Sequence, residues 1–221
     1  MDSAPAPAAF QSYLDELIAY GSEESRKQDL LAARAEYTLL TGEVFEDDKC
    51  FEMRMASFLE FYLLDRVSPV NGKTPAQEVY ERYLREGPAE HASVFRAFTE
   101  TVHGLFEVKK LKKDLVRLRE LYSGKDHDVT ERRQLVGLDK GDVLEARLIP
   151  FSGMLLFSPA FCYHPREAVK LILKEVKRRK KKEPSRPPRE LVYACAKMAL
   201  KTDRYRQIAV ERIYDFENPV L

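Results

Sequence analysis

The sequence has no long apolar run, and a membrane-spanning helix is therefore not expected. Its longest uncharged apolar stretch, residues 148–163, is interrupted by two prolines and a glycine, whereas a span needs about 20 continuous apolar residues. Residues 1–7 are acidic and proline-rich and lack the basic end and apolar centre of a signal peptide. We therefore expect a cytoplasmic protein with no membrane span.

Glycine is scarce, with nine residues in 221, and none stands in a G-x-x-x-x-G-K or G-x-G-x-x-G pattern. Those patterns let backbone N–H groups close on a phosphate ahead of a helix, so we do not expect nucleotide binding of these kinds. No G-x-S-x-G elbow is present to expose a nucleophilic serine, and Ser152-Gly153 is more simply a hairpin turn. The sequence names no catalytic residue, which makes an enzyme the less favoured class.

Cysteine is also scarce: Cys50, Cys162 and Cys195 are odd in number and far apart. This usage is typical of a reducing compartment, where each thiol behaves as a small buried hydrophobic group. A structural zinc site needs paired ligands a few residues apart, and the sequence has no such pair of cysteines. We expect neither a metal nor another cofactor.

The composition is that of a folded domain, with 44% hydrophobic residues and a formal net charge of +1. Disorder as the main state is excluded because the chain is rich in apolar residues and nearly neutral. The charge is nevertheless uneven. Residues 1–66 contain fourteen acids and six bases, for a net charge of −8, whereas residues 166–189 contain eleven bases and three acids, for +8.

Helical periodicity dominates residues 10–103, after a leader of residues 1–9 that we expect to be disordered. Apolar residues spaced three and four apart predict helices in this region, including a second helix marked by Leu30, Leu31, Ala35 and Leu39. A further helix is expected to open at Thr74, with Thr74 as N-cap, Pro75 in the first turn and Gln77 completing a capping box. The helix from about Asp47, with Phe51, Met55, Phe58, Leu59, Tyr62 and Leu63, is expected at the centre of the core. Tyr62 and Asp65 lie one turn apart on that helix, which is compatible with a pocket lining, but we favour core packing for Tyr62 and a surface carboxylate for Asp65.

Residues 104–163 change to a period of two, which predicts short strands with one solvent-facing side. Turn sequences at 123–126 and 139–142 separate them. Several strands joined by tight turns favour a small antiparallel sheet or a partly open barrel, packed on the helices because isolated hairpins are marginal. Residues 164–221 return to a helical period, and Thr202 or Asp203 is expected to cap the last helix.

Several segments resemble a loosely defined set of uncharacterised bacterial cytoplasmic proteins. They lie within residues 45–163 and are Phe58-Leu59-Glu60-Phe61-Tyr62-Leu63-Leu64-Asp65-Arg66, Gly72-Lys73-Thr74-Pro75, Gly104-Leu105-Phe106-Glu107-Val108, Leu118 to Tyr122, Val129-Thr130-Glu131-Arg132 and Gly141 to Pro150. The resemblance implies a helical half followed by a β module, and it carries over no catalytic residue. Some members of that set end in a zinc motif like that of the SecA motor, and the paired ligands of that motif are absent here.

The strongest local signal is a basic tract of six consecutive cations, 177–182, preceded by one further lysine. Its candidate binding residues are Lys174, Lys177, Arg178, Arg179, Lys180, Lys181 and Lys182. Such a run is compatible with a solvated helix end, where cations are favourable, with phosphate binding, or with docking on an acidic protein surface. It lacks interleaved aromatics, and a pI of about 7.7 is low for a dedicated nucleic-acid domain.

Together these patterns predict an α+β protein with a helical N-terminal half, a small central β module and a helical C-terminal segment. The favoured function is that of a non-enzymatic regulatory or interaction protein that binds a protein partner. The alternative is a weakly sequence-specific nucleic-acid binder that uses residues 166–189. The sequence names neither the partner nor the oligomeric state.

Overall fold

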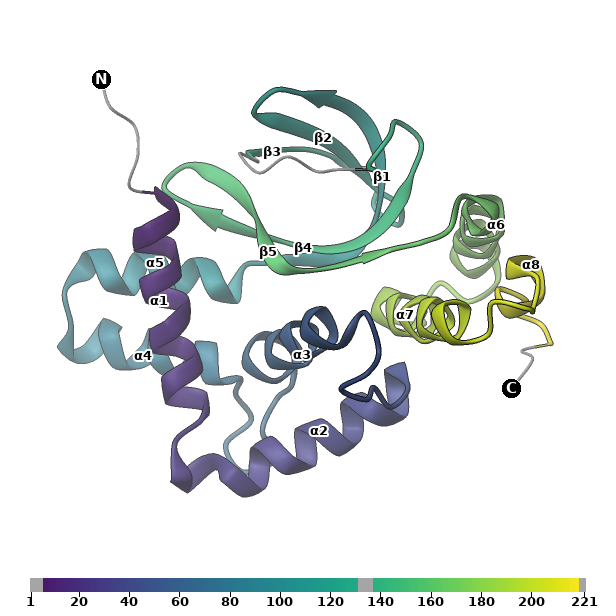
Figure 1. Cartoon of the computed structure of the whole chain (residues 1–221). Coiled ribbons are helices and arrows are strands. Elements are labelled where there is room, and N and C mark those ends of the chain that lie inside the picture. The colour runs from purple at the N-terminus through teal and green to yellow at the C-terminus, as the bar shows by residue number, and fades with distance from the viewer. Residues whose placement is uncertain (1–5, 131–136, 219–221) are drawn as a thin grey trace.

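The computed structural model describes residues 6–130 and 137–218, and it confirms the α+β class (Figure 1). The N-terminal half contains α1 (Ala6–Gly21), a 3₁₀ turn η1 (Glu24–Arg26), α2 (Lys27–Thr41), α3 (Phe51–Glu60), a π-helical turn η2 (Phe61–Asp65), α4 (Pro75–Glu86) and α5 (Ala89–Thr99). The strands are β1 (Val102–Lys112), β2 (Leu115–Glu120), β3 (Asp126–Thr130), β4 (Val143–Phe151) and β5 (Met154–Tyr163). Three helices follow: α6 (Arg166–Lys182), α7 (Pro188–Arg204) and α8 (Val210–Ile213).

The prediction of a disordered leader over residues 1–9 is wrong for residues 6–9. Residues 1–5 lie outside the described part of the chain, and residues 6–9 already belong to α1. Helix propensity explains the difference, because three of these four residues are alanine, the best helix former, and Pro7 lies within the first turn, where the missing N–H costs nothing.

The predicted start of α4 is confirmed. Thr74 Oγ1 accepts from the Gln77 N–H at 3.2 Å, and Gln77 Oε1 accepts from the Thr74 N–H at 2.9 Å. Both halves of the predicted capping box are therefore present, with Pro75 as the first helical residue. Each donor would otherwise lack an intrahelical partner, so the box fixes where α4 begins.

The predicted cap of the last helix is wrong. Thr202 and Asp203 both lie inside α7, which continues to Arg204, and α8 instead begins after Ala209. The Thr202 hydroxyl donates to the carbonyl of Met198 at 3.0 Å. This back-bonding within the helix is a common alternative to capping for threonine, and it leaves the helix uninterrupted.

The five strands close into a barrel in the order β1-β2-β3-β5-β4. All neighbouring pairs are antiparallel except β3 with β5, which pair in parallel between Thr130 and Leu156. The expected antiparallel sheet or partly open barrel is therefore a closed barrel with one parallel seam. This strand order and sense are those of the oligonucleotide/oligosaccharide-binding barrel, a fold that hosts many functions.

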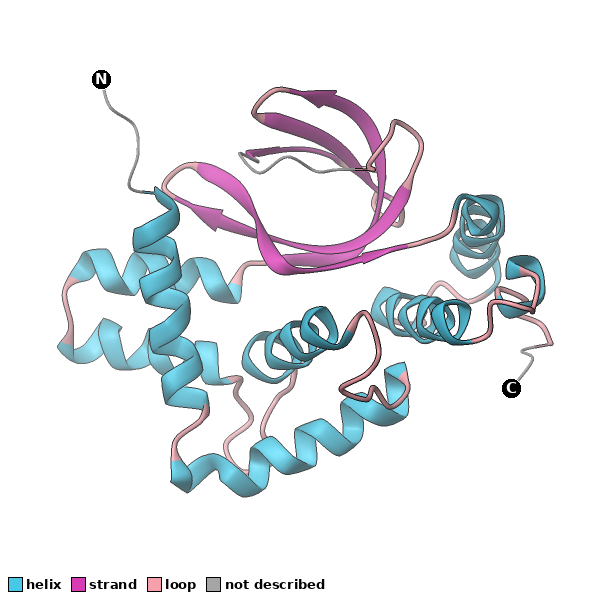
Figure 2. Cartoon of the chain, in the orientation of Figure 1, coloured by secondary structure: helices cyan, strands magenta, loops and turns pink. Residues whose placement is uncertain are grey.

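The helices gather along one side of the barrel, next to β4 and β5 (Figure 2). Inside the barrel, β4 contributes Leu144, Ala146 and Leu148 to an apolar core. On its outer side Val143 joins the cluster of α6, α7 and α8, whereas Ile149 and Phe151 join the cluster of α1 to α5. The outer face of β4 thus links two helical cores, and its middle positions, Glu145 and Arg147, fall between them.

Within the described residues, none of the helices combines the length and the apolar composition that crossing a membrane requires.

Candidate functional site

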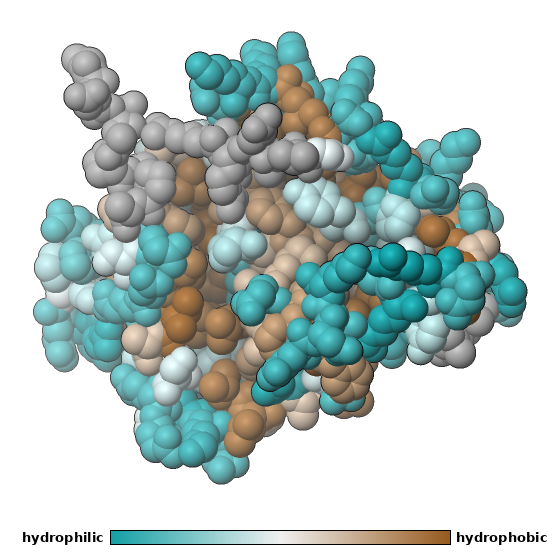
Figure 3. Space-filling model, viewed as in Figure 1, coloured by the Kyte–Doolittle hydropathy of each residue, from teal (hydrophilic) through white to brown (hydrophobic). Residues whose placement is uncertain are grey.

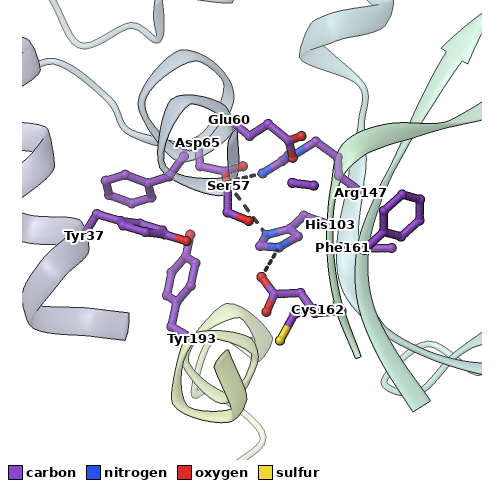
Figure 4. A pocket seen from close by; sticks show the side chains of 13 residues that line it. Tyr37, Ser57, Glu60, Asp65, His103, Arg147, Phe161, Cys162 and Tyr193 are labelled. Atoms are coloured by element: carbon purple, nitrogen blue, oxygen red, sulfur yellow. Dashed lines mark hydrogen bonds and ion pairs between the residues drawn. The ribbon is translucent and has the colours of Figure 1, made fainter. Parts of the chain in front are cut away.

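A buried ionic network occupies the gap between the two helical cores, centred on Arg147 (Figure 4). The Arg147 side chain is 2% exposed. Its Nε donates to Glu60 at 3.1 Å, its Nη1 donates to the Thr101 hydroxyl at 2.8 Å, and its Nη2 pairs with Asp65. Helix α3, the turn η2 and the loop between α5 and β1 therefore converge on one strand residue.

The π-helical turn η2 explains how two carboxylates reach the same guanidinium. The Arg66 N–H donates to the Phe61 carbonyl five residues back, at 2.8 Å. In an α-helix, with 3.6 residues per turn, Glu60 and Asp65 would lie on different faces. The wider π turn brings residues five apart nearly into line, so both carboxylates face Arg147.

Asp65 is therefore not the surface carboxylate that the sequence predicted. Its side chain is 19% exposed and pairs with Arg147, because the π turn rotates it inward. Glu145 and Arg147 are buried and also contradict the expectation of a solvent-facing strand side. Residues of α3, η2 and the loop after α5 bond to Arg147, and His103 bonds to Glu145.

His103 extends the network from Asp65 to Glu145. Its Nε2 lies 3.0 Å from Glu145 Oε1, and its Nδ1 lies 3.8 Å from Asp65 Oδ2. Burial alone would raise the pKa of Glu145, but the hydrogen bond with His103, together with electrostatic interactions that include Arg54, outweighs burial and lowers that pKa. Burial raises the pKa of Glu60 despite the opposing charge of Arg147. The two buried carboxyls are thus shifted in opposite directions.

The space enclosed by this network is about 10 Å³, close to the volume needed by one water molecule. It is too small for a substrate. We therefore interpret the network as the polar junction that fixes the helices to the barrel, and we assign it no catalytic step.

An open cleft lies nearby, and Cys162 lines both this cleft and the small space at the network. It has a volume of about 540 Å³ and runs between the start of α3, the end of β5 and α7. Its apolar walls include Cys50, Met53, Pro165, Ala196, Ala199 and Leu200. Volumes of about 300–1,000 Å³ are typical of small-molecule sites, and the sequence could not indicate this one because its walls come from three distant segments.

Two polar side chains that line the cleft are buried with an unpaired atom. Arg54 is 3% exposed, its Nη2 donates to the Thr41 carbonyl at 2.8 Å, and its Nε has no partner in the described structure. His164 is 5% exposed, its Nδ1 lies 3.0 Å from the Tyr214 hydroxyl, and its Nε2 also has no partner there. Buried polar atoms are normally paired, so these two atoms are unusual.

The three cysteines are all buried and free, as the sequence predicted. Burial raises the pKa of the Cys162 and Cys195 thiols. Because the thiolate is the reactive form, these pKa directions favour the structural role that the sequence indicated.

The predicted basic tract is the end of α6, and the structure divides it into two groups. Arg178 pairs with Glu175 and Glu183, Arg179 pairs with Glu175 at 2.7 Å, and Lys180 donates to the Tyr122 carbonyl. These three cations have structural partners. The other four are exposed and form no ion pair within the described ranges: Lys174, Lys177, Lys181 and Lys182.

The outer face of β2 and β3 has its charges paired across the strands. Arg117 donates to both oxygens of Asp128 at 2.6 and 2.7 Å, and Arg119 donates to both oxygens of Asp126 at 2.7 and 3.1 Å. In barrels that bind single-stranded nucleic acid, this region offers aromatic stacking platforms and free cations. Here the four most exposed outward residues, Arg117, Arg119, Asp126 and Asp128, are charged and neutralise one another.

Comparison with protein-family models matches residues 17–192 to a family described as "Family of unknown function (DUF7986)". The chain belongs to this family. The match includes all five strands, the Arg147 network and the whole of α6. Neither the curated proteins nor the solved structures gave a match to the chain. For this DUF7986 member, the function must therefore be argued from its surfaces and its cleft.

Proposed function

We propose that this DUF7986 protein is a non-enzymatic regulatory or protein-interaction protein that acts by binding a protein partner. The observation that carries the proposal is an apolar stripe on the solvent face of α2, defined by Leu31, Ala35 and Leu39. Leu31 is 52% exposed and Leu39 is 79% exposed. Single exposed leucines are ordinary, but aligned ones are typical of interaction surfaces.

The stripe results from a helix with two apolar faces. Ala33, Tyr37 and Thr41 recur every four residues and face the core, where the Tyr37 ring contacts those of Phe58, Phe61 and Tyr193. The sequence marked Leu31, Ala35 and Leu39 as helical, but the structure turns these residues outward. Aromatic packing of Tyr37 decides which face is buried, and Figure 3 shows apolar surface along α2 at the lower edge of the molecule.

Charge near the stripe indicates the kind of partner. Glu43, Glu46 and Asp47 are exposed just beyond the C-terminal end of α2, within the segment of net charge −8. Phe45, 51% exposed, adds apolar area among them. An amphipathic helix with basic residues would match both features, with its apolar face on the stripe and its cations toward these acids.

The test compares Leu39→Glu with Leu84→Glu, a matched change at a 64% exposed leucine on α4. Both variants should keep the wild-type melting temperature. Proteins captured from the source cells and then purified should bind the Leu39→Glu variant at least about tenfold more weakly, since apolar anchors dominate such interfaces. Equal binding by both variants would contradict an interaction through α2.

Nucleic-acid binding through residues 166–189 is the second candidate. Its support is the strand order of the barrel, shared with nucleic-acid-binding folds, together with the four unpaired lysines on α6. The paired charges on β2 and β3 weigh against the usual binding face. Replacing those four lysines with Gln should remove most of the salt dependence of any RNA or DNA affinity. Negligible wild-type affinity near 0.15 M salt would reject this candidate.

We also propose that the protein acts in the cytoplasm of a bacterial cell. The three buried, free cysteines support a reducing compartment, and the sequence resemblance supports the bacterial origin. Fractionation of the source cells followed by immunodetection would test the location, and recovery outside the cytoplasm would contradict it.

A further inference from the structure

We propose that the 540 Å³ cleft between α3, β5 and α7 binds a small organic monoanion, a carboxylate carried on an apolar or aromatic body. The cleft shares no lining residue with the stripe on α2, and the proposal does not depend on a protein partner.

Arg54 supplies the reason for an anion. Its guanidinium is buried, yet the described residues provide no ion pair to it. The guanidinium donates one hydrogen bond to the Thr41 carbonyl, and its Cζ lies 5.7 Å from the centre of the Tyr37 ring. The charge of Glu145 also acts on Arg54, but the side chain of Glu145 bonds to His103. A buried charge without a paired counterion is costly. A ligand carboxylate in the cleft would provide that counterion.

The charges of the cleft favour one negative charge on the ligand rather than two. Lys49 and Asp203 are exposed residues at the rim and balance each other. Burial lowers the pKa of His164 to about 4, so its ring is neutral near pH 7. Arg54 then leaves a net charge of +1, which a carboxylate neutralises. A phosphate dianion would keep one negative charge without a counterion in the cleft.

The walls define the rest of the ligand. Met53, Pro165, Ala199 and Leu200 line most of the cleft with carbon surface, which suits an apolar or aromatic group. The His164 ring lies on the same lining and adds no charge near pH 7. A polar sugar or a nucleotide would leave most of its hydrogen-bonding groups unpaired against such walls.

The experiment uses the full chain with its methionine methyl groups labelled with ¹³C. The probes are benzoate, indole-3-acetate and octanoate, each compared with its uncharged amide and with inorganic phosphate. At least one acid should shift the Met53 methyl resonance saturably and leave that of Met154, on β5 outside the cleft lining, unchanged. The matching amide should bind at least about tenfold more weakly, because a charge-assisted hydrogen bond is lost.

Variants then assign the binding to Arg54. Arg54→Gln should weaken binding of the acid by about 10- to 100-fold, and Arg54→Lys, which keeps the charge but loses Nε, should give an intermediate loss. Lys170→Gln removes a cation from the exposed face of α6, outside the cleft, and should bind like the wild type.

Three results would overturn the proposal. The first is that none of the three acids shifts Met53. The second is that an acid and its amide bind equally, and the third is that phosphate binds as tightly as the acids. The Met53 measurement uses wild-type protein, so the proposal stays testable even if Arg54→Gln does not fold.

Discussion

Two faces of the same barrel carry alternating charged residues, which are exposed to solvent on one face and buried on the other. On β2 and β3 the pairs Arg117–Asp128 and Arg119–Asp126 are 42–49% exposed. On β4, Arg147 is 2% exposed and its partners Glu60 and Asp65 are 9% and 19% exposed. Similar chemical pairs therefore sit in water on one face and between helical cores on the other. Burial raises both the cost of desolvation and the penalty for losing a partner, so the two faces should respond very differently to substitution.

The largest effect is expected for Arg147→Ala. It leaves the buried Glu60 and the partly buried Asp65 without the arginine, and breaking a buried pair typically costs about 3–5 kcal/mol. Denaturant unfolding monitored by circular dichroism measures the loss. The triple variant Glu60→Gln, Asp65→Asn, Arg147→Met removes all three charges together and should recover part of this stability. If Arg147→Ala unfolds with the same free energy as the wild type, the network does not stabilise the junction between the helices and the barrel.

Acidification should also act on the buried side. The pKa of His164 is lowered by burial to about 4, below its ordinary value of about 6.5. Between these values the unfolded chain binds a proton that the folded chain does not, so stability falls as the pH decreases from about 6.5 to 4. The loss is about 3 kcal/mol relative to the plateau at higher pH.

The variant His164→Gln isolates this contribution, since its stability should lack that part of the pH dependence. Asp126 and Asp128, on the exposed face, have pKa values lowered by their arginine hydrogen bonds, so their contribution is lost only at lower pH, as each becomes protonated. Identical pH profiles for the wild type and His164→Gln between pH 7 and 4 would contradict a neutral buried ring.

The basic tract offers the same contrast within one helix. Glu175→Ala leaves Arg179, 7% exposed, without its carboxylate, and should cost about 1–3 kcal/mol. Replacing Lys174, Lys177, Lys181 and Lys182 with Gln should leave the melting temperature nearly unchanged, because surface substitutions away from special features have small effects. Calorimetry compares the two variants. If both variants are destabilised equally, the tract does not consist of one group of structurally paired cations and one group of solvent-exposed lysines.

The smallest effect is expected on β2. Arg117→Ala removes a bidentate pair that is exposed to solvent, and exposed pairs contribute little. The melting temperature should move by no more than about 2 °C, and the change should diminish further in high salt. If Arg117→Ala loses as much stability as Arg147→Ala, the two faces do not differ in the way that their burial predicts.

The sequence by itself determined the features that depend on neighbours along the chain. Thr74, Pro75 and Gln77 specify the start of α4 because a capping box needs only residues three apart. The change of period near residue 104 located the barrel, whose first strand begins at Val102, and the free cysteines were expected to be buried. Periodicity and capping are local properties, so one sequence suffices to predict them.

Only the tertiary structure decided which charged and apolar residues face water. The alternation on β4 looks like that on β2, but helices cover one strand and leave the other exposed, so Glu145 and Arg147 became buried. On α2, Tyr37 packs inward and turns Leu31 and Leu39 outward. The cleft beside Arg54 joins residues more than one hundred positions apart. Such contacts depend on how whole elements pack, and no pattern within a single element encodes that packing.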